Sequence, residues 1–177
     1  MTSINKIEEN KMTAKLGVKM ASTILGITQV NIDFIDGVGF RNTGSSSVFS
    51  PQKYKISFNL DWLRQSEMLE VLATSFHETR HAYQKLHTDF HPGLKYSEKK
   101  ETVDSWRTDF LSYQKPGMEL KSDYLLQSIE IDAIAFSHYL LKELFKTSTL
   151  IPSEVKEEVE SMIKEYHYII PKERTKQ

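Results

Sequence analysis

The chain of 177 residues contains no cysteine. Disulfide bonds and thiolate metal ligands are therefore excluded, and any metal site must be built from histidine, aspartate and glutamate side chains. The sequence also lacks the run of about 18 apolar residues that a membrane-spanning helix requires. Its first residues include no apolar stretch long enough for a signal peptide. We therefore expect a soluble, cytoplasmic protein that does not enter a membrane.

A surplus of positive charge is absent as well. Lys and Arg number 23 and Asp and Glu number 24, which gives a formal net charge of −1. A protein that binds a phosphate backbone needs clustered positive charge, so nucleic acid is not an expected partner. Hydrophobic residues make up 39% and charged residues 27% of the chain, the balance of an ordinary globular protein. At this length we expect one domain that spans residues 1–177.

The first third of the chain predicts a helix followed by strands. Apolar residues recur at mostly helical spacing from Ser3 to Leu25, and Gly26 is a suitable stop. Two stretches then alternate between apolar and polar residues, Val30 to Ile35 and Tyr54 to Asn59, which indicates two strands. We expect these strands to pair antiparallel, with Ser47 to Ser50 as a candidate third strand.

The second half of the chain has the apolar periodicity of helices throughout. The expected helices run approximately from Ser66 to Leu86, from Val103 to Tyr113, from Ser122 to Phe145 and from Ser153 to His167. The third of them is apolar nearly all round except for Glu130 and Asp132, so it should be the buried helix of the group. The whole pattern predicts an α+β fold with an N-terminal helix, a small antiparallel sheet and a mostly helical second half.

The residues most suited to chemistry are in the segment His77-Glu78-Thr79-Arg80-His81, which has the form HExxH. On a helix, an offset of four residues corresponds to about 400° of rotation, so both imidazole rings lie on one face and can reach one ion. Glu78 is rotated by about 100° from His77, which suits contact with a water molecule held by the ion. The motif predicts Zn²⁺ bound by His77 and His81, with Glu78 as the catalytic base.

A catalytic zinc ion has three protein ligands and one open position. His87 is one candidate for the third ligand, since HETRHAYQKLH places its histidines as in the metzincin pattern HExxHxxGxxH. The glycine position is Gln84, however, and in a continuing helix His87 lies about 240° around from His81. Glu130 is the favoured candidate, because a carboxylate in an apolar helix is costly unless it is paired or bound to a cation. Asp132 lies about 200° around that helix, and we expect it to hold a neighbouring group or to cap a loop.

These residues resemble those of the gluzincin-type metallopeptidases, in which HExxH on one helix is completed by a glutamate on the next. Small bacterial and mobile-element zincin-like proteins have HExRHxxQ followed by QxxEIDAxAF, and this chain is similar at 77–84 and 127–136. The second segment is also similar to part of the E-x-x-A-x-x-F-A-x-x-L-L pattern of the ImmA/IrrE metallopeptidases, which cleave transcriptional repressors. The resemblance implies a zincin-like fold, with His77, His81 and Glu130 as metal ligands and Glu78 as catalytic base.

The function that the resemblance implies is hydrolysis of peptide bonds. We expect a polypeptide substrate, with regulatory proteins among the candidates, extended along the strand from Tyr54 to Asn59, which precedes the motif helix as an edge strand does in zincins. Tyr83, Tyr124 and His138 are candidates for the donor that stabilises the oxyanion, and the sequence does not choose among them. The alternative is a non-catalytic regulatory or interaction protein that binds its metal on the same fold.

Overall fold

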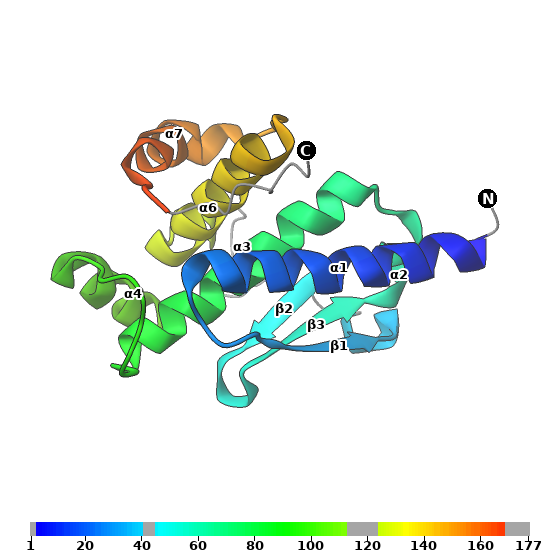
Figure 1. Ribbon diagram of the computed structural model, residues 1–177, viewed down its shortest axis with the longest axis horizontal. Coiled ribbons are helices and arrows are strands. Elements are labelled where there is room, and N and C mark those ends of the chain that lie inside the picture. The colour runs from blue at the N-terminus through cyan, green and yellow to red at the C-terminus, as the bar shows by residue number, and fades with distance from the viewer. Residues whose placement is uncertain (1–2, 41–44, 113–123, 169–177) are drawn as a thin grey trace, which may run out of the picture.

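The structure is a computed structural model that describes residues 3–40, 45–112 and 124–168. It has a mixed α+β architecture in which long helices accompany a small sheet of three strands. The main elements in chain order are α1 (Ser3–Leu25), β1 (Asn31–Ile35), β2 (Ser47–Ser50), β3 (Lys55–Asn59), α2 (Leu60–Gln65), α3 (Met68–Thr88), α4 (Lys100–Leu111), α6 (Ser128–Phe145) and α7 (Lys156–Glu165). In Figure 1 the sheet lies on one side of α1 and α3, and α6 and α7 lie on the other.

Helix α1 has the predicted bounds and ends where Gly26 takes a positive φ of 67°. A residue with a side chain adopts that left-handed conformation only at a cost, so glycine is the natural stop. Along its length α1 packs closely against α3: a Cβ added to Gly17 would lie 2.7 Å from the Cβ of Ser75. The absence of a side chain at Gly17 therefore allows the two helices to approach each other.

The sheet has the strand order β1-β3-β2 and is mixed rather than antiparallel. β3 pairs antiparallel with β2, where Ser47 lies opposite Phe58, but parallel with β1, where Asn31 lies opposite Lys55. The prediction of an antiparallel pair is therefore wrong for β1 and β3. The physical reason is the segment between them, which forms β2 and turns back into β3, so that β3 runs in the same direction as β1. The candidate strand β2 is confirmed, and it is an edge strand that packs against α3.

The helices of the second half follow the predicted order. The short helix α2 is not predicted; Asn59 begins it by accepting hydrogen bonds from two backbone N–H groups. Because α2 occupies the preceding residues, α3 begins at Met68, two residues later than expected. Helix α6 begins at Ser128, and α7 follows a 3₁₀ turn. Tyr113 and residues 122–123, which the prediction included in helices, lie outside the described residues.

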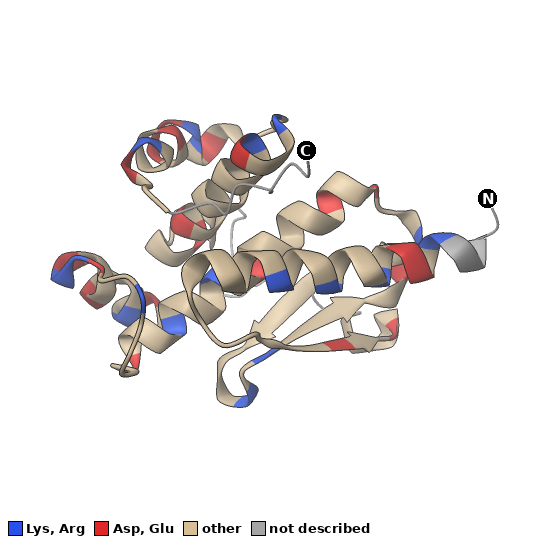
Figure 2. Ribbon diagram, in the orientation of Figure 1, with Lys and Arg blue, Asp and Glu red and all other residues tan. Residues whose placement is uncertain are grey.

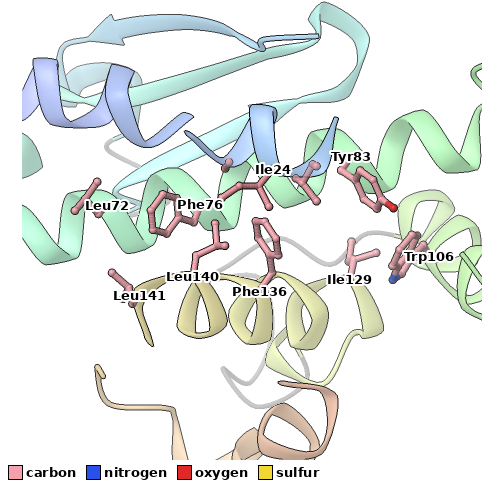
Figure 3. Close-up of a cluster of buried hydrophobic side chains, with 11 residues drawn as sticks. Ile24, Leu72, Phe76, Tyr83, Trp106, Ile129, Phe136, Leu140 and Leu141 are labelled. Atoms are coloured by element: carbon pink, nitrogen blue, oxygen red, sulfur yellow. The ribbon is translucent and has the colours of Figure 1, made fainter. Parts of the chain in front are cut away.

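Helix α3 contributes to two hydrophobic clusters. The α6-side cluster, drawn in Figure 3, joins α3 to α1, α4 and α6 and contains Ile24, Leu72, Phe76, Tyr83, Trp106, Ile129, Phe136, Leu140 and Leu141. The sheet-side cluster joins α1, α2 and α3 to the strands and contains Ala14, Val18, Phe49, Ile56, Phe58, Leu63, Val71 and Ala82. The helix that bears the HExxH motif is therefore held from both sides by buried apolar side chains.

Most charged residues that the structure describes are exposed or half-buried. Figure 2 shows residues of both signs intermingled along α4 and α7. Within the described ranges, no helix combines the length and the apolar character needed to cross a membrane. Five Asp, Glu, Arg or His side chains are nevertheless buried on α3 and α6: Glu78, Arg80, His81, Glu130 and Asp132. Burial of a charge is unfavourable unless the charge is paired, so the partners of these five define the centre of interest.

Candidate metal centre

His77 and His81 lie one turn apart on α3, and their rings meet at the interface with α6. The two Nε2 atoms are 3.0 Å apart, and the rings are nearly perpendicular with centroids separated by 4.6 Å. Leu72 and Phe76 belong to the same side of α3 and anchor it on the α6-side cluster. The apolar stripe of α3 thus directs both imidazoles toward the same neighbour.

Glu130, in the first turn of α6, completes the cluster. Its Oε2 lies 3.3 Å from His77 Nε2, and its Oε1 lies 3.4 Å from His81 Nε2. One ligand atom from each of the three residues lies within 4.8 Å of the others, and no second group of this kind occurs in the part of the chain that the structure describes. Four tetrahedral ligands at about 2.0 Å from a zinc ion are roughly 3.3 Å apart. The donors and their spacing therefore fit such an ion.

The three side chains are also coupled electrostatically. Burial is the largest single effect on the pKa of His81 and lowers it, but Glu130, with smaller contributions from Glu78 and Gln84, raises the pKa to about 9. For Glu130 the effects are reversed: burial raises its pKa, and His81 and His77 together bring it well below the ordinary value of 4.5. The arrangement thus favours a negative carboxylate with positive charge beside it, and a cation bound between the three residues would take the place of the proton on His81.

Glu78 lies beside the cluster rather than in it. Its side chain is buried, and its Oε1 accepts a hydrogen bond of 2.6 Å from Ser47 Oγ. Ser47 belongs to the edge strand β2, 31 positions earlier in the chain, so the sheet fixes one oxygen of this carboxylate. Sequence reasoning missed Ser47, because a serine in a turn-rich segment carries no signal of its distant partner.

His87 does not join the cluster. Helix α3 continues past Gln84 without a break, so the chain does not turn back toward His81. The His87 ring instead packs against Tyr83, with centroids 4.4 Å apart, and lies 6.2 Å from the ring of Trp106. Burial in these surroundings lowers the pKa of His87. The structure therefore contradicts the metzincin-like ligand set.

Asp132 is not part of the cluster and instead holds Arg80. The guanidinium donates from Nε to Oδ2 at 2.7 Å and from Nη2 to Oδ1 at 3.0 Å. Burial by itself lowers the pKa of Arg80, but Asp132, Tyr168 and Tyr166 together raise it well above its ordinary value, so the guanidinium is charged. The prediction that Asp132 holds a neighbouring group is confirmed. Around the guanidinium stand five aromatic rings, with centroids 4.4 to 5.5 Å from its central carbon: Tyr83, Trp106, Phe136, Tyr166 and Tyr168.

The three candidate oxyanion donors are placed differently. The hydroxyl of Tyr83 donates to Glu98 at 2.7 Å, and the Tyr83 ring packs against the guanidinium of Arg80. Tyr124 lies before the start of α6. His138 is on α6, and its pKa is lowered by burial and by the nearby charge of His77. Among the three candidates, His138 is the one whose pKa responds to a residue of the cluster.

Comparisons of the chain with known proteins provide no relative. No protein-family model, no curated protein and no solved structure matches it. The chemistry available at the centre therefore follows from its own residues. Two imidazoles and a carboxylate can hold a cation, and a second carboxylate, that of Glu78, lies close enough to His81 to affect its pKa.

Proposed function

We propose that the protein is a zinc-dependent metallopeptidase of the gluzincin type, with Glu78 as general base. The observation that carries this proposal is the convergence of His77, His81 and Glu130 from two helices, with Glu78 beside them. Structural zinc sites use four protein ligands, whereas catalytic sites use three and leave one position open. Among the described residues this cluster offers three, which supports catalysis over a structural role.

The residues at the centre have different proposed roles in the reaction. When bound, zinc lowers the pKa of a water molecule toward about 7 and polarises a carbonyl group. Glu78 would accept a proton from such a water and return it to the leaving amine. Since Ser47 occupies Oε1, we assign Oε2 of Glu78 as the oxygen that takes the proton. His138 is the proposed donor to the oxyanion.

A polypeptide is the proposed substrate, bound in extended form along the edge strand β2. The predicted edge strand, Tyr54 to Asn59, corresponds to β3, and this prediction is wrong, because β1 and β2 pair with the two edges of β3 and make it central. β2 pairs with β3 on one side only, among the strands that the structure describes. An extended peptide can add to such an edge through backbone hydrogen bonds.

The hydrogen-bonding pattern between β2 and β3 supports β2 as the strand that binds the peptide. The backbone N–H of Asn59 donates to the carbonyl oxygen of Ser46 at 2.9 Å, which identifies these two residues as a hydrogen-bonded pair. In an antiparallel ladder such pairs alternate, so Ser47 and Phe49 direct their N–H and C=O groups away from β3. Ser47 is also the residue that holds Glu78. A peptide added at this edge would therefore lie next to the general base.

Replacement of Glu78 by glutamine tests the proposal, because it keeps the size of the side chain and removes its basicity. Glu78→Gln should bind zinc as the wild type does, while hydrolysis of unfolded casein, of the protein's own chain or of candidate regulators falls at least about 100-fold. His77→Ala should lose both zinc and activity, since two remaining ligands hold zinc poorly. The exposed Glu157→Gln on α7 is a matched control that should change neither property.

A different result would favour a protein that binds zinc without catalysis. A wild-type protein that binds zinc but cleaves none of these substrates, together with a Glu78→Gln variant that still binds a natural partner, would favour the non-catalytic regulatory protein. Zinc content, measured on protein purified without chelator, has to be determined for each variant in the same preparation.

A further inference from the structure

Gln84 is fully buried on α3, between His81 and the start of α6. Its side-chain Nε2 lies 3.0 Å from the carbonyl oxygen of Ile129 and 2.6 Å from Oδ2 of Asp132. Its Oε1 lies 2.8 Å from Nδ1 of His81. One amide side chain therefore links a metal-ligand candidate to two groups on the opposite helix.

The surroundings of Gln84 fix which way its amide points. An amide nitrogen can donate to both oxygens on the α6 side, whereas an amide oxygen in that place would face two acceptors without a proton between them. The oxygen must therefore face His81. Because this oxygen can only accept, Nδ1 of His81 must be the donor, and Nε2 is the ring nitrogen left to bind an ion. His81 Nε2 is also the atom that faces Glu130, at 3.4 Å.

Asp132 fixes the other end of this chain of hydrogen bonds. Arg80 donates to both oxygens of its carboxylate, at 2.7 and 3.0 Å, and the hydroxyl of Tyr166 donates to Oδ1. Asp132 and Arg80 are at most 2% exposed, so water does not compete for these bonds. The carboxylate that receives Gln84 is thus held in place by groups on α3 and by the segment after α7.

We propose that Gln84 is a positioning residue, which holds His81 in the ring orientation and tautomer that metal binding requires, and that Asp132 acts on the centre through Gln84. The inference rests on the proposed function, because it assigns the role of Gln84 to the same metal centre. Hydrogen-bonded partners of ligating histidines commonly contribute 10- to 100-fold to metal affinity. Gln84 supplies such a partner without itself contacting the ion.

The test compares Gln84→Met with Thr79→Val. Methionine retains the length of the glutamine side chain but offers His81 no amide oxygen. Thr79 is also fully buried on α3, and its hydroxyl donates only to the Ser75 carbonyl at 2.7 Å, so its loss controls for a buried hydrogen bond that does not reach His81. Zinc dissociation constants, measured by competition with a chelator, should rise about 10- to 100-fold for Gln84→Met and less than about 3-fold for Thr79→Val.

Proton NMR of the zinc-loaded proteins provides a readout that a merely structural role would not change. The His81 Nδ1–H resonance should be protected from exchange in the wild type and in Thr79→Val, and lost in Gln84→Met. If Gln84→Met fails to fold, Gln84→Asn, which withdraws the amide from His81 by one methylene, should show the same losses. Equal zinc affinity in the wild type and the Gln84 variant would overturn the role of Gln84 alone, whereas a wild type that binds no zinc would overturn the metal centre itself.

Discussion

Ser47 and Glu78 are joined by a hydrogen bond of 2.6 Å that connects the edge strand β2 to the HExxH helix. One donor thus occupies one oxygen of the proposed base, and the geometry of the base depends on the sheet as well as on its own helix. The bond is buried at both ends, with Ser47 and Glu78 each 7% exposed, so water does not readily replace it.

Ser47→Ala should lower kcat about 10-fold while the zinc dissociation constant stays unchanged. The loss corresponds to about 1.4 kcal/mol, the order expected for a hydrogen bond to a charged group. Ser50→Ala, at the other end of β2, is the control and should leave kcat unchanged. Steady-state kinetics on a peptide substrate checks the prediction, and a parallel loss of zinc affinity in Ser47→Ala would contradict the assignment of Ser47 to the base.

Zinc should stabilise the wild-type protein against heat, and Glu130→Gln should abolish most of that effect. At a free zinc concentration of 100 times Kd, linkage gives about 2.7 kcal/mol, or roughly 5 to 10 °C in Tm for a domain of this size. His87→Ala should retain the full shift, because His87 packs against Tyr83 and Trp106 rather than in the cluster. Calorimetry with and without zinc distinguishes the two ligand sets.

Asp132→Asn should lower the free energy of unfolding by about 3 to 5 kcal/mol, because it leaves the buried Arg80 charge with only the more distant Glu98, 3.5 Å from its Nη2, as counter-ion. Urea titration of the metal-free protein measures this loss. The exposed pair of Lys11 and Glu8, 2.8 Å apart, offers the comparison. Glu8→Gln should change the free energy of unfolding by less than about 1 kcal/mol, since exposed ion pairs contribute little. Equal effects of the two substitutions would show that Glu98 alone compensates the charge of Arg80.

Tyr54→Phe should leave stability unchanged or raise it by up to about 1 kcal/mol. The Tyr54 hydroxyl is buried and has no hydrogen-bond partner among the described residues, and burial raises its pKa to about 12. Removing such a group relieves a desolvation penalty. In the unfolded chain the phenol ionises near 10, so the contribution of Tyr54 to stability is complete below pH 10 and is lost as the pH rises toward 12.

Tyr166→Phe provides the contrast to Tyr54→Phe, because its hydroxyl donates to Asp132. The same chemical change should there destabilise the protein by about 1 to 3 kcal/mol. Urea titrations of both variants at pH 7 and of Tyr54→Phe above pH 10 check the signs. A loss of more than about 1 kcal/mol in Tyr54→Phe would mean that its hydroxyl is hydrogen-bonded to ordered water.

The sequence predicts those features that depend on local periodicity. The four-residue offset of His77 and His81 fixes their common face, and the apolar surroundings of Glu130 mark it as a carboxylate in need of a partner. Helix α1 is predicted to the residue because its apolar pattern ends at a glycine. The pairing of β1 with β3 is not predictable in this way, since alternation identifies a strand but says nothing of its neighbour or direction.

The contacts that sequence reasoning missed are those between distant segments. Ser47 reaches Glu78 across 31 positions, and Tyr168 accepts a hydrogen bond from Arg80 across 88. Neither hydroxyl belongs to a motif with characteristic spacing, so only the folded chain reveals them. Gln84 gave a weak signal, as a polar residue one turn after His81 on a buried face, but its partners on α6 could not be deduced from α3 alone.

The two hydrophobic clusters that share α3 have a consequence for how the domain opens. Movement of α6 away from α3 would disrupt the α6-side cluster and take Glu130 away from His77 and His81, while the sheet-side cluster could stay packed. Such partial opening is a local unfolding equilibrium separate from global unfolding. An ion bound by residues of both helices would oppose this separation. Amide hydrogen exchange in α6 would therefore slow when the ion is bound, while exchange in the strands would not change.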